Sequence, residues 1–171
     1  MNPMNKLEFK STLAIDEAGR ICGTAWPFGS PDRVGDMIEK GAFASAVAPV
    51  PMLFSHNPDK PVGAWTSIQE DANGLQVEGQ LLVEDVPLAK EARALVRAGA
   101  MRGLSIGFTT RKAFNRKGGG RTITDLELVE ISLVSIPMHP NARINSAKTA
   151  ADAIAIAAAI NRATAQLTKG N

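Results

Sequence analysis

The chain has 171 residues, of which 44% are hydrophobic and 21% charged, and its formal net charge is only +2. This composition is typical of one globular domain with a real core, and it excludes a general attraction to nucleic acid or membranes, so a polyanion site would have to be a local patch. The single cysteine, Cys22, excludes an internal disulfide. No segment resembles a signal peptide or a membrane span, so we expect a cytosolic-type protein.

The first half of the chain predicts β structure, because apolar residues alternate with polar or small ones in short runs separated by turn residues. The expected strands lie at 6–16, 20–28, 50–56, 62–70 and 75–84. The last two are joined through the sequence Asp-Ala-Asn-Gly, a good hairpin signal. Elsewhere in this half we expect a Gly-, Pro- and Asp-rich loop at 29–36, a short helix around Ala42–Ala48, and a turn at 57–61.

The second half predicts one clear helix and two further strands. The helix at 86–100 has a proline in its first turn and an apolar stripe along one side. That stripe comprises Leu88, Ala92, Leu95, Val96 and Gly99. Strands are expected at 101–110 and 121–137, with a basic, glycine-rich connection at 111–120 between them.

These elements predict an α+β fold, a single and mainly antiparallel β-barrel with a few surrounding helices. The domain is expected to span residues 1–145. The alanine-rich segment 146–171 lacks aromatic residues and favours a helical tail or linker outside the core.

The stretch 101–110 contains the sequence Gly-Leu-Ser-Ile-Gly around Ser105, which matches the G-x-S-x-G pattern of the α/β-hydrolase nucleophile. That pattern requires a strand, a sharp turn at the serine and then a helix. The residues after Ser105 instead alternate and include β-branched types, as in a strand that continues. The order is also unusual for such an enzyme, because His56 precedes the serine. The sequence therefore predicts a strand here and not a nucleophile elbow.

In such a strand Ser105 shares a face with Gly103 and Gly107. Two glycines weaken a strand, so their presence requires a physical reason. One reason is the close approach of another backbone, such as that of a bound peptide. The other is tight packing of a helix on this face, with Ser105 as a small filler, and the segment alone leaves both open.

Two histidines are candidates for a catalytic site. His56 ends an apolar strand, and its ordinary pKa near neutrality suits a general base, although a histidine there can also simply hydrogen-bond its turn. His139 lies between two prolines in "PMHPNARI", which favours a loop. It is nevertheless a rival for the third position of a catalytic triad.

Glu130 is the least expected residue in the stretch 121–137. Strict alternation places it on one face with Leu128 and Ser132, and places Val129 and Ile131 on the other. A carboxylate in such an apolar strand is costly unless it is paired or hydrogen-bonded. Glu130 could form a salt bridge with an arginine, or it could orient and stabilise a histidine as an acid does in a triad.

Other chemistries have little support in the sequence. Two histidines and one cysteine without ligand spacing argue against a zinc site, and the glycine-rich connection lacks the strand and helix of a phosphate loop. That connection, taken with the adjoining Arg121, is basic and has no acidic residue. The cationic residues of this loop are Arg111, Lys112, Arg116, Lys117 and Arg121. Such a cluster is typical of a solvated hairpin tip, but it could also contact nucleic acid or an acidic partner.

Four stretches together resemble one family, the prohead (capsid maturation) proteases of tailed phages. They are DRVGDMIEKGAFASAV at 32–47, MLFSHNPDKPVGAW at 52–65, GLSIGF at 103–108 and LVEISLVSIPMHPNARI at 128–144. The resemblance runs from about Lys6 to Ile144, and the order and spacing of the stretches agree with it.

The resemblance implies a serine endopeptidase with a barrel similar to that of the herpesvirus assemblin proteases. By motif, His56 is then the general base, Ser105 the nucleophile and Glu130 the third catalytic residue. Because the assemblin relatives use a second histidine, His139 stays an alternative to Glu130. The oxyanion donors are suspected in the loop that includes Arg143, and neither a cofactor nor a metal is implied.

The implied substrates are scaffold protein, the scaffold-like segment of the major capsid protein, and the protease itself. The implied location is the immature capsid, the prohead, in the host cytoplasm. We expect a homo-oligomer, of which a dimer is one form, and neither a membrane nor a nucleic-acid partner. The alternatives are a non-catalytic, barrel-like capsid or scaffold-assembly module, in which Ser105 and His56 are structural, and a barrel that binds nucleic acid through the basic connection.

Overall fold

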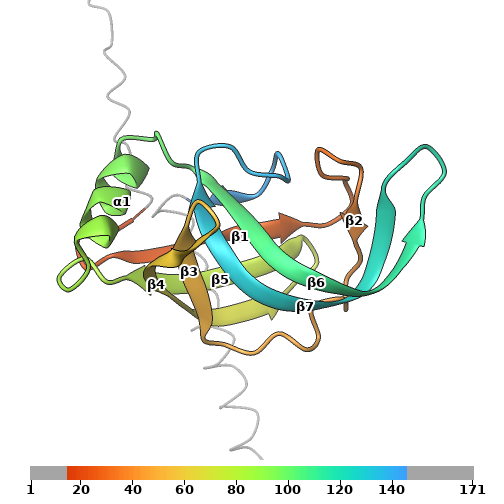
Figure 1. The fold of residues 1–171 in the computed structure, drawn as a ribbon, viewed down its shortest axis with the longest axis horizontal. Helices are drawn as coiled ribbons and strands as arrows, with labels where there is room; N and C mark the ends of the chain where they lie inside the picture. Colours follow the sequence, from red (N-terminus) through yellow and green to blue (C-terminus); the bar gives the residue numbers. More distant parts are fainter. Residues whose placement is uncertain (1–14, 146–171) are drawn as a thin grey trace, which may run out of the picture.

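The computed structural model describes residues 15–145, which form eight strands and one helix. In chain order the elements are β1 (Arg20–Pro27), β2 (Met37–Ile38), β3 (Val50–Phe54), β4 (Asn57–Glu70), β5 (Gly74–Leu81), α1 (Pro87–Arg97), β6 (Gly103–Asn115), β7 (Arg121–Val134) and β8 (Arg143–Ile144). The strands wrap into a barrel, with α1 at one end (Figure 1).

The barrel closes through strand β6. The strand order is β2-β7-β3-β4-β5-β1-β8-β6, and β6 also pairs with β7, so that every strand except β2 belongs to a closed ring. Most pairs are antiparallel, whereas β7 runs parallel to β2 and to β3. Closure is how an antiparallel sheet removes its free edges. The predicted α+β class, with a mainly antiparallel barrel, is confirmed, and the described residues contain one helix.

Large apolar side chains fill the interior of the barrel. Those that are fully buried include Met52, Trp65, Leu75, Leu81, Leu104, Ile131 and Leu133. Trp65 also donates a hydrogen bond from Nε1 to the backbone oxygen of Ile131, at 2.9 Å. This bond links β4 to β7 and fixes the backbone of β7 at that residue.

Helix α1 packs small side chains against the barrel. It begins at Pro87, in the first turn as the sequence predicts, and it buries Ala89, Ala92 and Val96. Leu95, which was expected on the apolar stripe, is 38% exposed. The buried face is thus narrower and is built from smaller residues than the stripe suggests.

The short helix expected around Ala42–Ala48 does not form. Residues 40–45 make successive turns instead, and Gly41, just before the expected helix, has a φ of +97°. The Glu70 carboxylate of β4 accepts hydrogen bonds from the backbone N–H groups of Gly41 and Phe43, at 2.8 and 3.1 Å. A side chain from another strand therefore satisfies the donors that a helix start would leave free.

Strand β4 begins earlier than the sequence suggests. Phe54 pairs with Asn57 and Leu53 pairs with Pro61, so residues 58–60 have no partner in β3 and loop out, exposed, at the start of β4. The turn expected at 57–61 is thus a tight turn followed by an irregular start of the strand.

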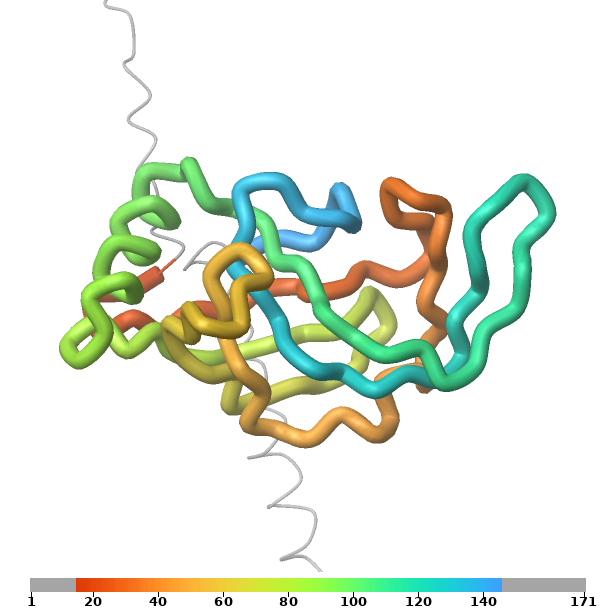
Figure 2. The backbone as a smooth tube through the Cα atoms, viewed as in Figure 1, coloured from red at the N-terminus to blue at the C-terminus, as the bar shows by residue number. Residues whose placement is uncertain are grey.

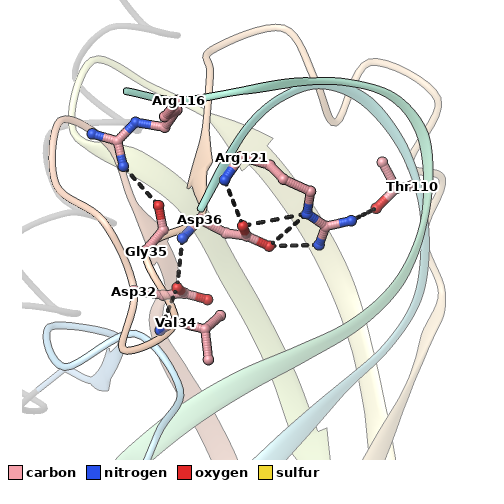
Figure 3. Close-up of polar contacts among 7 residues, drawn as sticks. All are labelled: Asp32, Val34, Gly35, Asp36, Thr110, Arg116 and Arg121. Atoms are coloured by element: carbon pink, nitrogen blue, oxygen red, sulfur yellow. Dashed lines mark hydrogen bonds and ion pairs between the residues drawn. The ribbon is translucent and has the colours of Figure 1, made fainter. Parts of the chain in front are cut away.

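The β6–β7 hairpin extends past the barrel as a long arm, and the loop before β2 lies beside it (Figures 1 and 2). Asp36 of this loop accepts hydrogen bonds from the backbone N–H of Arg121 at 2.8 Å and from Arg121 Nη2 at 2.5 Å. Arg116 donates to the backbone oxygen of Gly35 at 2.6 Å. Within the loop, Asp32 accepts the N–H of Asp36 (Figure 3). These contacts fasten the arm to the loop at the strand ends beside the hairpin turn, residues 116–120.

Among the described residues, no helix is long and apolar enough to cross a bilayer. Most of the strand expected at 6–16, and the whole tail expected at 146–171, lie outside the described residues.

Candidate active site

Ser105 lies on β6, on the face that points away from the core. Its neighbours Leu104 and Ile106 point inward and belong to the buried core. Strand β6 continues without a break from Gly103 to Asn115, so the expected strand is confirmed and no elbow is present at the serine.

Strand β7 places two polar residues beside Ser105. In the antiparallel pairing Ser105 lies opposite Ser132, and Gly107 lies opposite Glu130. Residues directly opposite each other project from the same face of a sheet. Ser105, Ser132 and Glu130 therefore share the outer face, and their exposed fractions are only 5%, 0% and 8%.

His56 is carried by a tight turn between β3 and β4. Because Phe54 pairs with Asn57, Ser55 and His56 are the two central residues, and their φ angles are 55° and 57°. Positive φ at both central positions is typical of a type I′ turn, where Asn and Gly are the usual residues. Residues with larger side chains adopt this conformation at an energetic cost, which surrounding structure has to offset.

Two hydrogen bonds to β7 provide that support. The backbone N–H of Ser55 donates to the backbone oxygen of Leu133 at 3.0 Å. The backbone N–H of His56 donates to the hydroxyl of Ser132 at 2.9 Å. The turn is therefore fixed on the outer face of the strand that carries Glu130.

The His56 ring contacts the Glu130 carboxylate directly. Nδ1 of His56 lies 2.6 Å from Oε1 of Glu130, and the two side chains are 44% and 10% exposed. This hydrogen bond raises the pKa of His56, although partial burial of the ring opposes the rise. A carboxylate only accepts hydrogen bonds, so Nδ1 carries the proton and the neutral ring presents an unprotonated Nε2.

Ser132 completes the arrangement around Glu130. Its hydroxyl donates to Oε2 of Glu130 at 2.7 Å, while Oε1 faces His56. Sequence reasoning gave Ser132 no role. The only signal was its expected position on the same face as Glu130, and that signal does not distinguish a site residue from a small buried one.

The two glycines beside Ser105 make room for side chains. A Cβ atom on Gly107 would overlap Oε1 of Glu130 and lie 2.9 Å from its Cγ. On Gly103 it would lie 2.7 Å from Cδ of Pro137. In this structure the cleared face is thus occupied by the Glu130 carboxylate and a proline ring, rather than by a packed helix.

The strict alternation expected around Glu130 is interrupted by a β-bulge. Gly107 pairs with Glu130 but Phe108 pairs with Leu128, so Val129 is an extra residue in β7. The bulge leaves Val129 51% exposed and places Leu128 with Phe108, both packed against the core. The prediction that Leu128 shares the face of Glu130 is therefore wrong.

His139 lies in a different environment. Its ring is 2% exposed and packs edge-on against Trp26, with the ring centroids 4.9 Å apart. Nδ1 accepts the backbone N–H of Asn141 at 3.2 Å, so Nε2 carries the proton and faces the backbone oxygen of Ser30, also at 3.2 Å. Burial lowers the pKa of His139. Both ring nitrogens are thus engaged away from His56.

The start of β6, just before Ser105, lies beside residues 142 and 143 near the end of the described residues. Leu104 donates its N–H to the backbone oxygen of Ala142 at 3.2 Å, and Arg143 pairs with Gly103. The loop suspected of supplying oxyanion donors therefore lies beside the start of β6. Within the described structure, Ser105 and His56 share one side of the sheet without a hydrogen bond between their side chains.

Some of the arginines of the basic connection form ion pairs with carboxylates in the folded chain. Arg121 pairs with Asp36, and Arg111 pairs with Glu127 at 3.1 Å. Arg116 is engaged by the loop before β2. Two of the five cations are thus paired with carboxylates, whereas Arg116 keeps its charge because its partner is a carbonyl oxygen. Within residues 15–145, no group of three or more His, Cys, Asp or Glu side chains could hold a metal ion.

Comparison with known proteins agrees with the fold and the motifs. The protease of KSHV, solved with a hexapeptide phosphonate inhibitor, has a similar structure, with a TM-score of 0.50 at 11% sequence identity over 73% of this chain and 63% of that protein. The barrel therefore has the fold of a viral protease.

Sequence comparison identifies the family to which the chain belongs. A capsid polyprotein of Pseudomonas phage PAJU2 is 34% identical over 143 residues, which are 80% of this chain but 21% of that protein, so the chain spans about a fifth of this relative. A prohead protease of Enterobacteria phage HK97 is 33% identical over 159 residues, 83% of this chain and 70% of that protein. The family model described as caudovirus prohead serine protease matches residues 5–155. The chain belongs to this family, which confirms the resemblance found in the sequence.

Proposed function

We propose that this chain is a serine endopeptidase that acts during maturation of the phage prohead, with Ser105, His56 and Glu130 as its catalytic residues. The observation that carries the proposal is the 2.6 Å hydrogen bond between His56 Nδ1 and Glu130 Oε1, on the sheet face from which Ser105 projects. These three residues come from a turn and two neighbouring strands that one barrel holds in place.

In this proposal each residue has a defined task. Ser105 attacks the peptide carbonyl while the unprotonated Nε2 of His56 accepts the hydroxyl proton, and His56 later returns that proton to the leaving amine. Glu130 keeps the Nδ1 proton in place and stabilises the positive charge on the ring when it forms. The backbone around Arg143, which pairs with Gly103, is the proposed source of oxyanion donors.

The proposed substrates are scaffold protein, the scaffold-like segment of the major capsid protein, and the chain itself. The names of the relatives, prohead protease and capsid polyprotein, support this choice. An extended substrate segment would bind against the face of Ser105 by backbone hydrogen bonds. We place this activity inside the prohead, within the host cytoplasm, and propose that the protein acts as a homo-oligomer.

The division of the chain is also a proposal. Residues 1–145 would form the protease domain, and residues 146–171 a removable or scaffold-binding tail. The family model extends to residue 155, past the expected end of the domain, so truncation variants ending at 145 and 155 would define the boundary.

The proposal is tested by co-expressing the chain with its phage's scaffold and capsid proteins. Wild type should cleave scaffold protein or itself, and Ser105→Ala should not. Ser67→Ala, which removes a half-buried serine hydroxyl on β4, is the matched control and should process like wild type. Equal processing by wild type and Ser105→Ala would overturn the proposal in favour of a non-catalytic assembly module.

A further inference from the structure

We infer that Ser132 is a positioning residue that fixes His56 and Glu130 relative to each other. The inference rests on the proposed function, because it assigns a task within the same site. Its basis is that one buried hydroxyl contacts both the backbone of the histidine and the carboxylate of the glutamate.

The hydrogen-bonding capacity of Ser132 is used on both sides. Its hydroxyl hydrogen is donated to Oε2 of Glu130 at 2.7 Å, and its oxygen accepts the backbone N–H of His56 at 2.9 Å. The residue is completely buried, and its bond to Glu130 is buried with it. Serine is suited to this position because a hydroxyl both donates and accepts, whereas a carboxylate or a carbonyl only accepts.

The first bond limits rotation of the Glu130 carboxylate. With Oε2 held by Ser132, Oε1 is directed at Nδ1 of His56. The second bond fixes the turn, in which His56 has a φ of 57° that the local sequence does not favour. One hydroxyl thus orients the carboxylate and anchors the backbone of the residue that the carboxylate contacts.

Ser132 is also distinct from the nucleophile opposite it. Ser105 and Ser132 are cross-strand neighbours, but the hydroxyl of Ser132 is engaged by Glu130 and His56, and its residue has no exposed surface. Ser105 retains some exposure. Of the two serines, only Ser105 has any exposed surface.

The first test uses a fluorophosphonate probe, which modifies activated serines, with the modified residue located by mass spectrometry. Wild type should be labelled at Ser105. Ser132→Ala should be labelled at the same residue about 10- to 100-fold more slowly, the loss that follows from a misplacement of roughly 1 Å. Label on Ser132, or an unchanged rate in Ser132→Ala, would overturn the inference. Thr24→Val, which removes a hydroxyl bonded to Gln76 on the β1–β5 pair, should label at the wild-type rate.

A double-variant comparison separates positioning from general weakening of the fold. Because part of the effect of Ser132 passes through Glu130, Ser132→Ala should slow labelling by a smaller factor in a Glu130→Ala background than in wild type. Two independent, multiplicative losses would contradict the inference. Should Ser132→Ala unfold, Ser132→Cys, which keeps a weak donor and a side chain of similar shape, takes its place in both measurements.

The ring of His56 gives a readout that does not depend on the nucleophile. The chain has only two histidines, so the Nδ1 proton of His56 can be assigned by NMR with a His139→Asn variant as reference. Ser132→Ala should shift or broaden this resonance in a folded protein, and an unchanged resonance would overturn the inference. Absence of label on wild-type Ser105 would instead refute the proposed nucleophile, while the resonance still decides the role of Ser132.

Discussion

The carboxylate of Glu130 lies over Gly107, in the space that a side chain would occupy. A methyl group there would overlap Oε1, the atom that accepts the hydrogen bond from His56. We therefore expect Gly107→Ala to displace the carboxylate and to lower kcat/KM for scaffold cleavage by about 100-fold. Phe114→Ala, at an exposed position further along the same strand, should keep wild-type kcat/KM. Wild-type activity in Gly107→Ala would show that Glu130 needs no fixed position.

Replacing Glu130 by glutamine should change both the rate and its pH dependence. The carboxylate raises the pKa of His56, and a general base works only above its pKa. Glu130→Gln should therefore lower kcat by roughly 10²- to 10⁴-fold and move the acidic limb of the kcat/KM profile to lower pH. A pH series with purified variants measures both effects. An acidic limb that stays in place would contradict the link between Glu130 and His56.

The same pair makes stability depend on pH. His56 has a higher pKa in the folded than in the unfolded chain, so its contribution is fully present below the unfolded value of 6.5 and is lost as pH rises through the folded pKa. The difference in unfolding free energy between wild type and Glu130→Gln should therefore shrink as pH rises through that range. Urea unfolding at several pH values gives this difference, and one that grows with pH would contradict the assignment.

His139 should show the opposite pH effect and little effect on catalysis. Its pKa is lowered by burial, so the unfolded chain binds the proton more tightly and stability falls as pH drops below about 6.5. His139→Gln should flatten this decline, while the folded variant keeps kcat within a few-fold of wild type. A loss of kcat as large as that of Glu130→Gln would restore His139 as the third catalytic residue.

The contact between Asp36 and Arg121 should stabilise the arm. Asp36 is 9% exposed, accepts hydrogen bonds from the backbone N–H, Nε and Nη2 of Arg121, and has a lowered pKa mainly for that reason. Asp36→Asn should lower the free energy of unfolding by about 1–3 kcal/mol. A larger loss is not expected, because Arg121 is 45% exposed and solvent screens its charge.

The pH dependence and a control sharpen this prediction. The contribution of Asp36 is present above its unfolded pKa of 3.8 and is lost as pH falls through the lower folded value. Arg111→Gln, which breaks an exposed pair with Glu127, should cost less than about 1 kcal/mol. Equal losses in the two variants would show that burial of Asp36 adds nothing.

Local patterns in the sequence predicted the elements well. Alternation along 103–107 is enough to place Ser105 on a different face from Leu104, because successive residues of a strand point to opposite sides. It fails at Val129, since the bulge depends on how β7 meets β6 and not on β7 alone. The same limit explains the lost helix at 42–48, where a carboxylate from β4 holds the turn.

The assembly of the candidate site could not be predicted from local sequence patterns. His56 and Glu130 are 74 residues apart, and Asp36 and Arg121 are 85 apart, so neither contact follows from local spacing. The motifs around His56 and Ser105 supplied the candidates. The register of β6 against β7 is what brings Glu130 and Ser132 to the same face as Ser105.

The left-handed turn at Ser55 and His56 has a consequence for engineering this protein. A sequence selected for stability alone would carry Asn-Gly at these two positions, because those residues adopt positive φ at little cost. Such a replacement would relieve the backbone strain of the turn, but it would also remove the proposed general base and leave Glu130 without its partner. The trade-off between stability and activity is thus concentrated in two residues, and stabilising substitutions should be sought elsewhere in the barrel.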